Sequence, residues 1–152
     1  MAEACLDVIE RDEQLVAFQL GDETYGIEIA SIQEIIRLQE VTQVPGKGDE
    51  MEGIINLRGK IVPIMNLRRR LGLPHGERTS QSRVVVVSDG ECTVGMEVDS
   101  VIGVLKLVDS QIEKPSQIMS NNDMSHVRGV GKTDDALVIL LNVPAVMRRD
   151  QE

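Results

Sequence analysis

The sequence predicts a mostly β protein made of two small units of about five strands each. Short runs in which apolar and polar residues alternate recur throughout the chain, and a period of two is typical of half-buried strands. Turns rich in Gly, Asp and Asn separate these runs. Hydrophobic residues make up 41% of the 152 residues but aromatic residues only 1%, so the core must be aliphatic. Many short strands with turn signals between them are the pattern of small β-barrels.

An internal repeat indicates that the two units have similar structures. Tyr25–Ile32 matches Val94–Val101 in pattern, and the Gly, Glu and Ser of the two segments are identical. Further along each half, Ile64–Leu67 and Leu140–Val143 both run from an apolar strand into an Asn that can cap a helix. Either match alone could arise by chance. Because the two matches occur in the same order, they favour two related units.

The first half contains five runs with the periodicity or composition of strands: Leu15–Leu20, Thr24–Ile29, Val41–Val44, Gly53–Arg58 and Ile61–Met65. The first two are predicted to form a hairpin around Gly21. Residues 31–36 are ambiguous, because their apolar side chains fit one face of a short helix while their β-branched composition also suits a strand. We expect a short helix that leads into a strand near Ile35.

A hairpin over residues 53–65 is the feature around which the chain is organised. Its turn is predicted at Gly59-Lys60, where Gly takes the position that needs φ > 0. Pro63 cannot donate a backbone hydrogen bond, so its strand is expected at a sheet edge or at a bulge. Arg58 then stands at the end of an apolar strand, just before the turn.

A short basic helix is predicted directly after this hairpin. Asn66 can cap a helix over residues 67–71, and Gly72 can end it. The basic run at 68–70 is interpreted as a solvated helix face near the C-terminus, where positive charge suits the helix dipole. A docking role for these arginines is the alternative.

The second half also contains five runs that are predicted to form strands: Arg83–Ser88, Cys92–Val98, Ile102–Val108, His126–Lys132 and Ala136–Leu141. The run His126–Lys132 is rich in Gly and fits either a strand or a turn. Val84–Val87 consists of valine alone, which predicts burial on both faces. Asp89-Gly90 is a hairpin signal. Asn142 can cap a last helix that runs through Met147.

The net charge of −9 bounds the classes of partner. It disfavours nucleic acid and insertion at an anionic membrane surface, because both need Lys and Arg. Residues 1–13 are acidic without an apolar signal region, and we expect them to form a mobile arm. The longest apolar run, 136–141, is too short to span a bilayer. Cys5 and Cys92 cannot make a disulfide framework, so the chain is predicted to be cytoplasmic.

No motif for catalysis, metal binding or cofactor binding stands out. His75 and His126 are isolated, with no carboxylate or cysteine at ligand spacing. The chain has no nucleophile elbow, no phosphate-binding loop and no zinc-protease motif. We therefore expect no catalytic residue, no metal and no cofactor. A small all-β enzyme and an oligonucleotide-binding barrel are the alternatives, and the charge and missing aromatic residues disfavour the second.

Several short motifs follow one another in a fixed order. They are Tyr25–Ile29 (Y-G-I-E-I), Ile32–Ile35, Gly53–Ile64 (G-I-I-N-L-R-G-K-I-V-P-I), Val94–Val101, Arg128–Gly131 and Val138–Val143. In this order, and in a chain of this length, they resemble the CheW family, the coupling proteins of bacterial chemotaxis. The resemblance extends over roughly residues 14–148.

This resemblance implies two small SH3-like β-barrels of five strands, interleaved and sharing an interface, with short helices that include a C-terminal one. Residues 14–148 would form one domain with subdomains at approximately 14–82 and 83–148, between which strands can be exchanged. The implied function is that of a non-catalytic adaptor that couples methyl-accepting chemoreceptors to the histidine kinase CheA. The alternative is an adaptor in a related chemosensory-like pathway that controls pili or development.

The expected partners are the cytoplasmic tip of the receptor and the regulatory domain of CheA, at membrane-associated receptor arrays. The resemblance ties four positions to receptor coupling: Ile32, Glu34, Gly53 and Arg58. The kinase-binding surface is predicted at aliphatic residues of a barrel end: Val41, Val44 and Ile61.

The receptor positions also have structural explanations. Ile32 could be a core residue, and Gly53 could serve backbone geometry alone. Glu34 and Arg58 could form an internal ion pair that shapes a groove between the barrels. If that pair were deeply buried, removal of one partner would cost about 3 kcal/mol or more.

Overall fold

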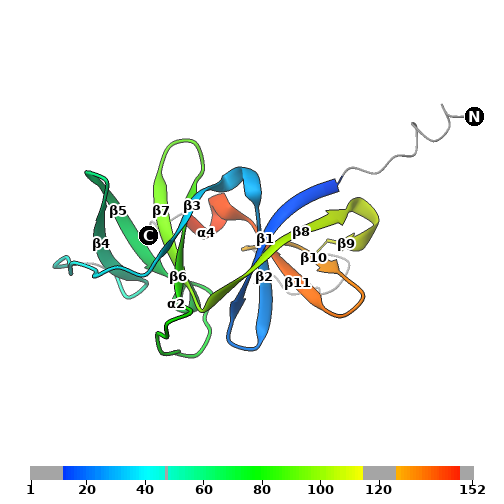
Figure 1. The fold of residues 1–152 in the computed structure, drawn as a ribbon, viewed down its shortest axis with the longest axis horizontal. Coiled ribbons are helices and arrows are strands. Elements are labelled where there is room, and N and C mark those ends of the chain that lie inside the picture. The colour runs from blue at the N-terminus through cyan, green and yellow to red at the C-terminus, as the bar shows by residue number, and fades with distance from the viewer. Residues whose placement is uncertain (1–11, 47, 115–125, 148–152) are drawn as a thin grey trace, which may run out of the picture.

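The computed structural model of the chain describes residues 12–46, 48–114 and 126–147. It contains two β-sheets, called sheet A and sheet B below, which lie at opposite ends of an elongated molecule (Figure 1). The predicted arm over residues 1–13 lies outside the described residues except for Asp12 and Glu13, which begin the first strand.

Sheet A has six strands, in the order β8 (Ser100–Val108), β1 (Asp12–Leu20), β2 (Glu23–Glu28), β11 (Leu137–Leu141), β10 (Val127–Lys132) and β9 (Ile112–Glu113). Sheet B has five strands, in the order β3 (Ile32–Arg37), β6 (Arg83–Ser88), β7 (Thr93–Val98), β5 (Lys60–Asn66) and β4 (Met51–Leu57). The mostly β prediction is therefore confirmed, and the Gly-rich run near 126–132 forms a strand.

Both sheets close on themselves, as small barrels do. In sheet A, β8 continues through a single 3-10 turn, η2 (Asp109–Gln111), into β9, so one stretch of chain forms both edges. In sheet B, the chain after β3 reaches the β4 edge through Thr42. The Thr42 N–H donates to the Ile54 carbonyl at 2.8 Å, and the Ile54 N–H donates back at 2.9 Å. The predicted strand Val41–Val44 is thus reduced to a single bridge, and that bridge closes sheet B.

The two sheets exchange strands, as the resemblance implied. Sheet A combines the β1–β2 hairpin with β8 to β11, whereas sheet B combines the β6–β7 hairpin with β3 to β5. The chain therefore crosses between the sheets twice. The first crossover is a 3-10 turn, η1 (Ile29–Ser31), between β2 and β3, and the second is the single residue Asp99 between β7 and β8.

The internal repeat is reproduced in the strand register. β2 pairs with β11 in parallel, with Gly26 opposite Leu140. β7 pairs with β5 in parallel, with Gly95 opposite Ile64. The repeated Gly of each unit thus faces the strand that precedes the capping Asn. Added Cβ atoms would meet side chains at 3.1 Å at Gly26 and 2.7 Å at Gly95, so close packing favours Gly at both places.

Three aliphatic clusters make up the core. The barrels formed by sheet A and sheet B are called barrel A and barrel B. Barrel A encloses one cluster around Leu15 and Leu140, and barrel B encloses another around Ile64, Val84 and Val86. A larger shared cluster lies between the sheets and includes Phe18, Ile27, Val85, Val87 and Met96. Successive valines of β6 thus point alternately into barrel B and into the shared core, which confirms burial of this strand on both faces.

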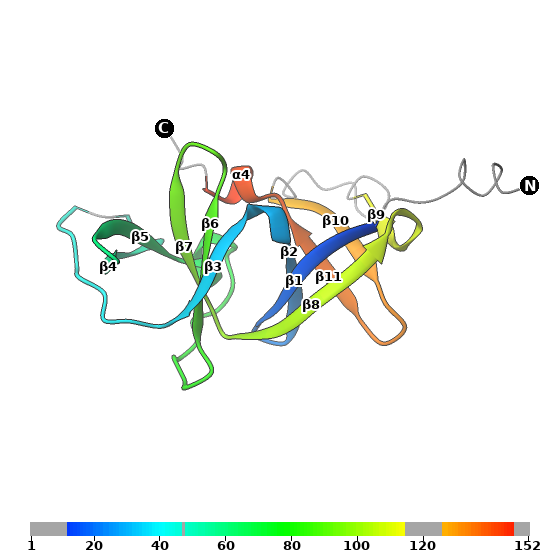
Figure 2. The same ribbon diagram turned by 45° about the horizontal axis from the view of Figure 1, so that its top comes forward.

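Two short helices follow the equivalent strands β5 and β11. The Asn66 side chain accepts a hydrogen bond from the Arg69 N–H at the start of α2 (Leu67–Arg70). The Asn142 side chain accepts one from the Ala145 N–H at 3.1 Å, at the start of α4 (Val143–Met147). Both predicted caps are confirmed. Figure 2 shows α4 between the two sheets, where its apolar residues join the shared core.

The sequence suggested a solvated face for the arginine run of α2, but only Arg69 of the three arginines is exposed. Arg70 has a side chain only 9% exposed, and it donates to the Val146 carbonyl at 2.8 Å and to the Ala145 carbonyl at 3.2 Å. Arg68 bonds the crossover residue Asp99. These cations therefore fasten α2 to elements of both sheets. A pattern of charge alone could not reveal partners so distant in sequence.

The β4–β5 turn lies one residue earlier than predicted. Its central residues are Arg58 and Gly59, with φ of +53° and +85°, and Leu57 pairs with Lys60. Positive φ at both central residues defines the type I′ hairpin turn. The Gly59 N–H donates to the Asn56 side chain at 2.8 Å, which supports this turn.

Two further expectations need correction. Pro63 lies neither at an edge nor at a bulge, since β5 runs between β7 and β4 and the β4–β5 register shift falls between Met51 and Gly53. The parallel pairing of β5 with β7 begins at Ile64, so the missing N–H of Pro63 removes no bond from that ladder. Residues 31–36 do follow a short helical turn into a strand, but the strand already begins at Ile32.

Candidate functional site

The predicted site residues all lie on or beside sheet B. Ile32 and Glu34 are in β3, Gly53 is in β4, Arg58 is in the β4–β5 turn, Ile61 is in β5, and Val41 and Val44 are in the segment that joins β3 to β4. Ile32 is partly buried and packs against the shared core, so it lies where the two sheets meet. One barrel therefore carries both the receptor positions and the kinase positions predicted from the sequence.

Glu34 and Arg58 form the internal ion pair that was considered from the sequence. Arg58 Nη2 donates to Glu34 Oε2. The Arg58 side chain is 70% exposed and that of Glu34 is 28% exposed. Exposed pairs of this kind contribute about 0.2–1 kcal/mol. The larger cost of breaking a deeply buried pair therefore does not apply, and the guanidinium remains accessible to a partner.

Gly53 has a structural requirement of its own. It is buried, its φ is +146°, and a Cβ there would lie 2.1 Å from the Thr42 carbonyl oxygen. A residue with a side chain would clash with backbone and would be strained in this conformation. Gly53 therefore permits the Thr42–Ile54 bridge that closes sheet B, and it cannot itself offer a side chain to a partner.

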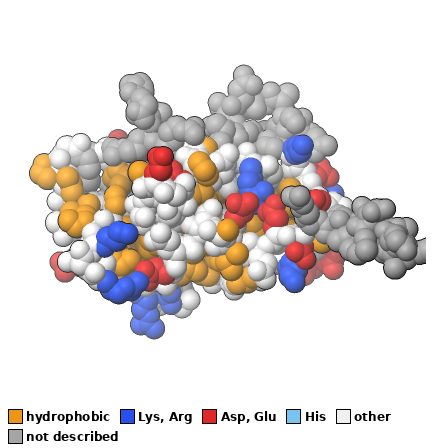
Figure 3. All heavy atoms as spheres, turned by 90° about the horizontal axis from the view of Figure 1, so that it is seen from above, with side chains coloured by type: hydrophobic (Ala, Val, Ile, Leu, Met, Phe, Trp, Pro, Cys, Tyr) orange, Lys and Arg blue, Asp and Glu red, His pale blue; other side chains and the backbone are white. Residues whose placement is uncertain are grey.

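The predicted kinase positions differ in accessibility. Ile61 is 67% exposed and Val44 is also exposed, whereas Val41 packs partly against the inner core of barrel B. Figure 3 shows hydrophobic side chains gathered at the end of the molecule that β4 and β5 form. Ile61 and Val44 are thus exposed aliphatic residues on the surface of barrel B, whereas Val41 is partly buried.

A second aliphatic surface was not recognised from the sequence. Ile35 of β3 pairs with Val85, and Val104 of β8 pairs with Val16, which in turn pairs with Ile27. Directly paired residues share a face of a sheet. Since Val85 and Ile27 belong to the shared core, exposed Ile35 and Val104 lie on the sheet faces that meet there. The alternation in 102–108 predicted a strand but could not indicate which face is left uncovered.

Asp99 is the centre of the polar contacts between the sheets. Its carboxylate accepts hydrogen bonds from Arg68 Nε at 3.1 Å, from Arg68 Nη2 at 2.5 Å and from the Gly21 N–H at 2.8 Å. Burial raises the pKa of this carboxyl, but the bonds from Arg68 and Gly21 outweigh burial, and the pKa lies below its ordinary value of 3.8. Asp99 is therefore held as a carboxylate between an arginine and a backbone amide.

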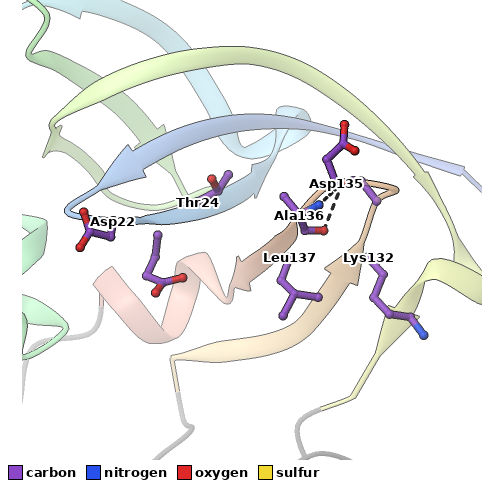
Figure 4. Close-up of a pocket in the computed structure, with 8 residues that line it drawn as sticks. Asp22, Thr24, Lys132, Asp135, Ala136 and Leu137 are labelled. Atoms are coloured by element: carbon purple, nitrogen blue, oxygen red, sulfur yellow. Dashed lines mark hydrogen bonds between the residues drawn. The ribbon is translucent and has the colours of Figure 1, made fainter.

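A hollow lies between the β1–β2 and β10–β11 turns. It is lined by Asp22, Glu23, Thr24, Lys132, Thr133, Asp135, Ala136 and Leu137. Asp22 and Lys132 lie on opposite sides of it, and the hydrogen bonds drawn join Thr133 to Ala136 within one turn (Figure 4). No group of three or more His, Cys, Asp or Glu in the described part of the chain is arranged to hold a metal ion. None of the helices in that part is long and apolar enough to cross a bilayer.

The comparison with protein families decides the relationship. The family described as CheW-like domain matches residues 14–151. The chain belongs to the CheW family. A chemotaxis protein CheW from Klebsiella aerogenes is 32% identical over 142 residues, which cover 91% of this chain and 84% of that protein. The crystal structure of the scaffolding protein TtCheW from Thermoanaerobacter tengcongensis is 32% identical, with a TM-score of 0.80, and the match covers 87% of this chain and 90% of that one.

A relative that is not called CheW also matches. Protein PilI from Pseudomonas aeruginosa is 31% identical over 88 residues, which cover 58% of this chain and 49% of that protein. The CheW-family relatives and the scaffolding structure support a chemotaxis adaptor.

Proposed function

We propose that this chain is a non-catalytic adaptor that couples methyl-accepting chemoreceptors to the histidine kinase CheA in the cytoplasm, at receptor arrays. The observation that carries the proposal is the presence of two exposed aliphatic surfaces on one small protein. One is the end of barrel B with Ile61 and Val44, and the other follows β3 and β8 with Ile35 and Val104. An adaptor needs two such surfaces, because it acts by holding two partners at high effective concentration.

The β3–β8 surface suits the receptor. An amphipathic helix presents spaced apolar anchors that fit an aliphatic surface with a few charges at its edge. Ile32 and the Glu34–Arg58 pair supply the edge on the β3 side, which fits their assignment to receptor coupling. Gly53 contributes indirectly, since it permits closure of the barrel on which these residues stand.

The end of barrel B is assigned to the kinase and can be tested with a matched control. Leu137 of β11 is 59% exposed and occupies in sheet A the place that Ile61 occupies in sheet B. The isolated regulatory domain of a CheA kinase from the same organism is titrated against the parent protein, Ile61→Glu and Leu137→Glu. We expect Ile61→Glu to weaken binding at least about tenfold, roughly 1.4 kcal/mol, with Leu137→Glu close to the parent.

The possible outcomes test the adaptor role and the position of the kinase-binding surface separately. Loss of binding in Leu137→Glu but not in Ile61→Glu would move the kinase to the other barrel and leave the adaptor role standing. If the folded parent protein bound no such domain from that genome, coupling to CheA would be refuted.

An adaptor in a related chemosensory-like pathway is the second candidate. The match to Protein PilI, which is not named a chemotaxis protein, favours it, although that match covers little more than half of the chain. The same titration distinguishes the two candidates when it includes the regulatory domain of every chemosensory kinase of the genome. Preference for a kinase encoded with pilus or developmental genes would favour the second candidate. Preference for a kinase encoded with flagellar genes would favour the first.

A further inference from the structure

The two crossovers between the sheets are fastened in different ways. At η1 the side chains are Ile29, Ala30 and Ser31, and no hydrogen bond of these side chains to other described residues is found. Asp99, at the other crossover, carries a carboxylate that bonds both sheets. Ala30 is the residue that corresponds to Asp99 in the internal repeat. The polar connection thus exists at one crossover only.

Asp99 joins parts of the chain that are far apart in sequence. The Gly21 N–H, in the β1–β2 turn of sheet A, donates to Oδ2 at 2.8 Å. Arg68, in the helix that follows β5 of sheet B, donates to both carboxylate oxygens. The Asp99 N–H in turn donates to the Gln19 carbonyl at 3.0 Å. A single residue therefore ties a turn of sheet A to a helix of sheet B.

Arg68 is itself held in place. Its Nη1 donates to the Pro74 carbonyl at 2.9 Å, and its side chain is only 17% exposed. A Cβ on Gly76 would lie 2.2 Å from the Arg68 Cζ, so the backbone at Gly76 packs directly against the guanidinium. A guanidinium fixed in this way presents its planar fork to the carboxylate in one orientation.

We propose that Asp99 and Arg68 form a latch that fixes the relative orientation of sheets A and B at the β7–β8 crossover, so that motion between the sheets is concentrated on the η1 side. Apart from the hydrogen bonds that Arg70 donates to α4, the rest of the contact described between the sheets is the shared apolar core, and hydrophobic attraction has no preferred direction. The two hydrogen bonds from Arg68 to the Asp99 carboxylate do have a preferred direction. The latch is a property of the fold and holds whichever partners the chain binds.

The distance between the sheets can be measured with two spin labels and pulsed electron paramagnetic resonance. The exposed native Cys92, in the β6–β7 turn, labels sheet B, and Asp135→Cys labels sheet A, in a background where Cys5 is replaced by Ser. In Asp99→Ala and in Arg68→Ala we expect the distance distribution to shift or to become wider than in the parent. Two controls accompany these variants.

The first control is Arg69→Ala, which removes a cation from the same helix turn. The Arg69 guanidinium bonds only a carbonyl of the preceding loop among the contacts seen, at Asp49, so this variant should keep the parent distribution. The second control is a label pair within sheet B, Cys92 with Lys60→Cys, which should be the same in all variants. Should Asp99→Ala fail to fold, Asp99→Asn replaces it, because Asn keeps an oxygen for the Gly21 N–H but loses the charge.

An unchanged distance between the sheets in the latch variants would overturn the proposal. Equal widening of the pair within sheet B would overturn it as well, because it would indicate general loosening of the fold. Widening between the sheets alone, absent in Arg69→Ala, would establish the latch.

Discussion

The β4–β5 hairpin of sheet B and the β10–β11 hairpin of sheet A occupy equivalent places, but they present opposite charges. Ile64 faces Gly95 in one sheet as Leu140 faces Gly26 in the other, so Ile61 corresponds to Leu137. Both of these aliphatic residues are more than half exposed. The three residues before them read Arg-Gly-Lys in β4–β5 and Asp-Asp-Ala in β10–β11. The difference teaches that the backbone and an exposed aliphatic residue are common to both ends, whereas the charge is particular to each.

The ion pair of sheet B has no counterpart in sheet A for the same reason. Glu34 corresponds to Gly103, and both lie directly after a register shift in the equivalent strands β3 and β8. Arg58 corresponds to Asp134 in the other hairpin. The Glu34–Arg58 pair is therefore not needed to build a barrel of this type, which favours a role at the surface of sheet B.

The two barrels also differ at a pair of equivalent glycines, Gly53 in sheet B and Gly129 in sheet A. Gly53 and Gly129 both follow a register shift, and they face Ile64 and Leu140. A Cβ on Gly53 would lie 2.1 Å from the Thr42 carbonyl oxygen, whereas a Cβ on Gly129 would lie 3.0 Å from that of Glu113. Only Gly53 of the two has a backbone conformation that disfavours other residues, with φ of +146°. Barrel B is thus closed more tightly than barrel A.

Gly53→Ala is predicted to have the largest effect. The clash is with backbone, which cannot repack, and the strain of the dihedral adds to it. We expect a loss of unfolding free energy of about 3–5 kcal/mol. Gly129→Ala should cost only about 1 kcal/mol, because the neighbouring chain needs to move a few tenths of an ångström. Urea denaturation of both variants measures the difference, and equal losses would contradict the comparison.

Replacement of Asp99, at the β7–β8 crossover, is predicted to have an effect on stability of intermediate size, and this effect should depend on pH. The folded pKa of Asp99 is lowered, so its stabilising contribution is present above the unfolded pKa, about 3.9, and is lost as pH falls through the folded value. Asp99→Asn should therefore be less stable than the parent between about pH 5 and 7, and the gap should close below about pH 4. Urea denaturation at several pH values tests this, and a gap that persisted unchanged in strong acid would refute it.

Much of the fold could be predicted because the sequence repeats the features that fix it. The alternation in the hairpins, the valine run of β6 and the capping residues Asn66 and Asn142 act locally, so each can be recognised without knowledge of the partner strand. The internal repeat indicated two related units, but the pairing of Gly26 with Leu140 was not predicted from it. The exchange of strands came from the family resemblance alone, since no local pattern states which sheet a strand joins.

The parts that could not be predicted depend on contacts between distant residues. Arg68 and Arg70 look like a charged helix face, but their partners lie 31 and 76 residues away. The turn was placed one residue late because Gly can take either central position of a two-residue loop, and only the pairing of Leu57 with Lys60 selects between them. Exposure of Val104 depends on which face of sheet A meets sheet B. These features follow from the packing of the two barrels, not from any single segment.

Arg58→Ala is predicted to change stability least and therefore to be the cleanest test of the surface that distinguishes sheet B from sheet A. The pair with Glu34 is exposed, so its loss should lower the unfolding free energy by less than about 1 kcal/mol. Ala is as strained as Arg at φ of +53°, so the turn should keep its form. Pull-down with a receptor tip fragment then reports on contact rather than on shape.

Arg58→Lys is the matched control, because it keeps the charge but not the planar fork. We expect binding to fall in Arg58→Ala and to recover partly in Arg58→Lys. Unchanged binding in Arg58→Ala, with an unchanged melting temperature, would remove Arg58 from the receptor surface and leave Ile32, Ile35 and Val104 to account for it.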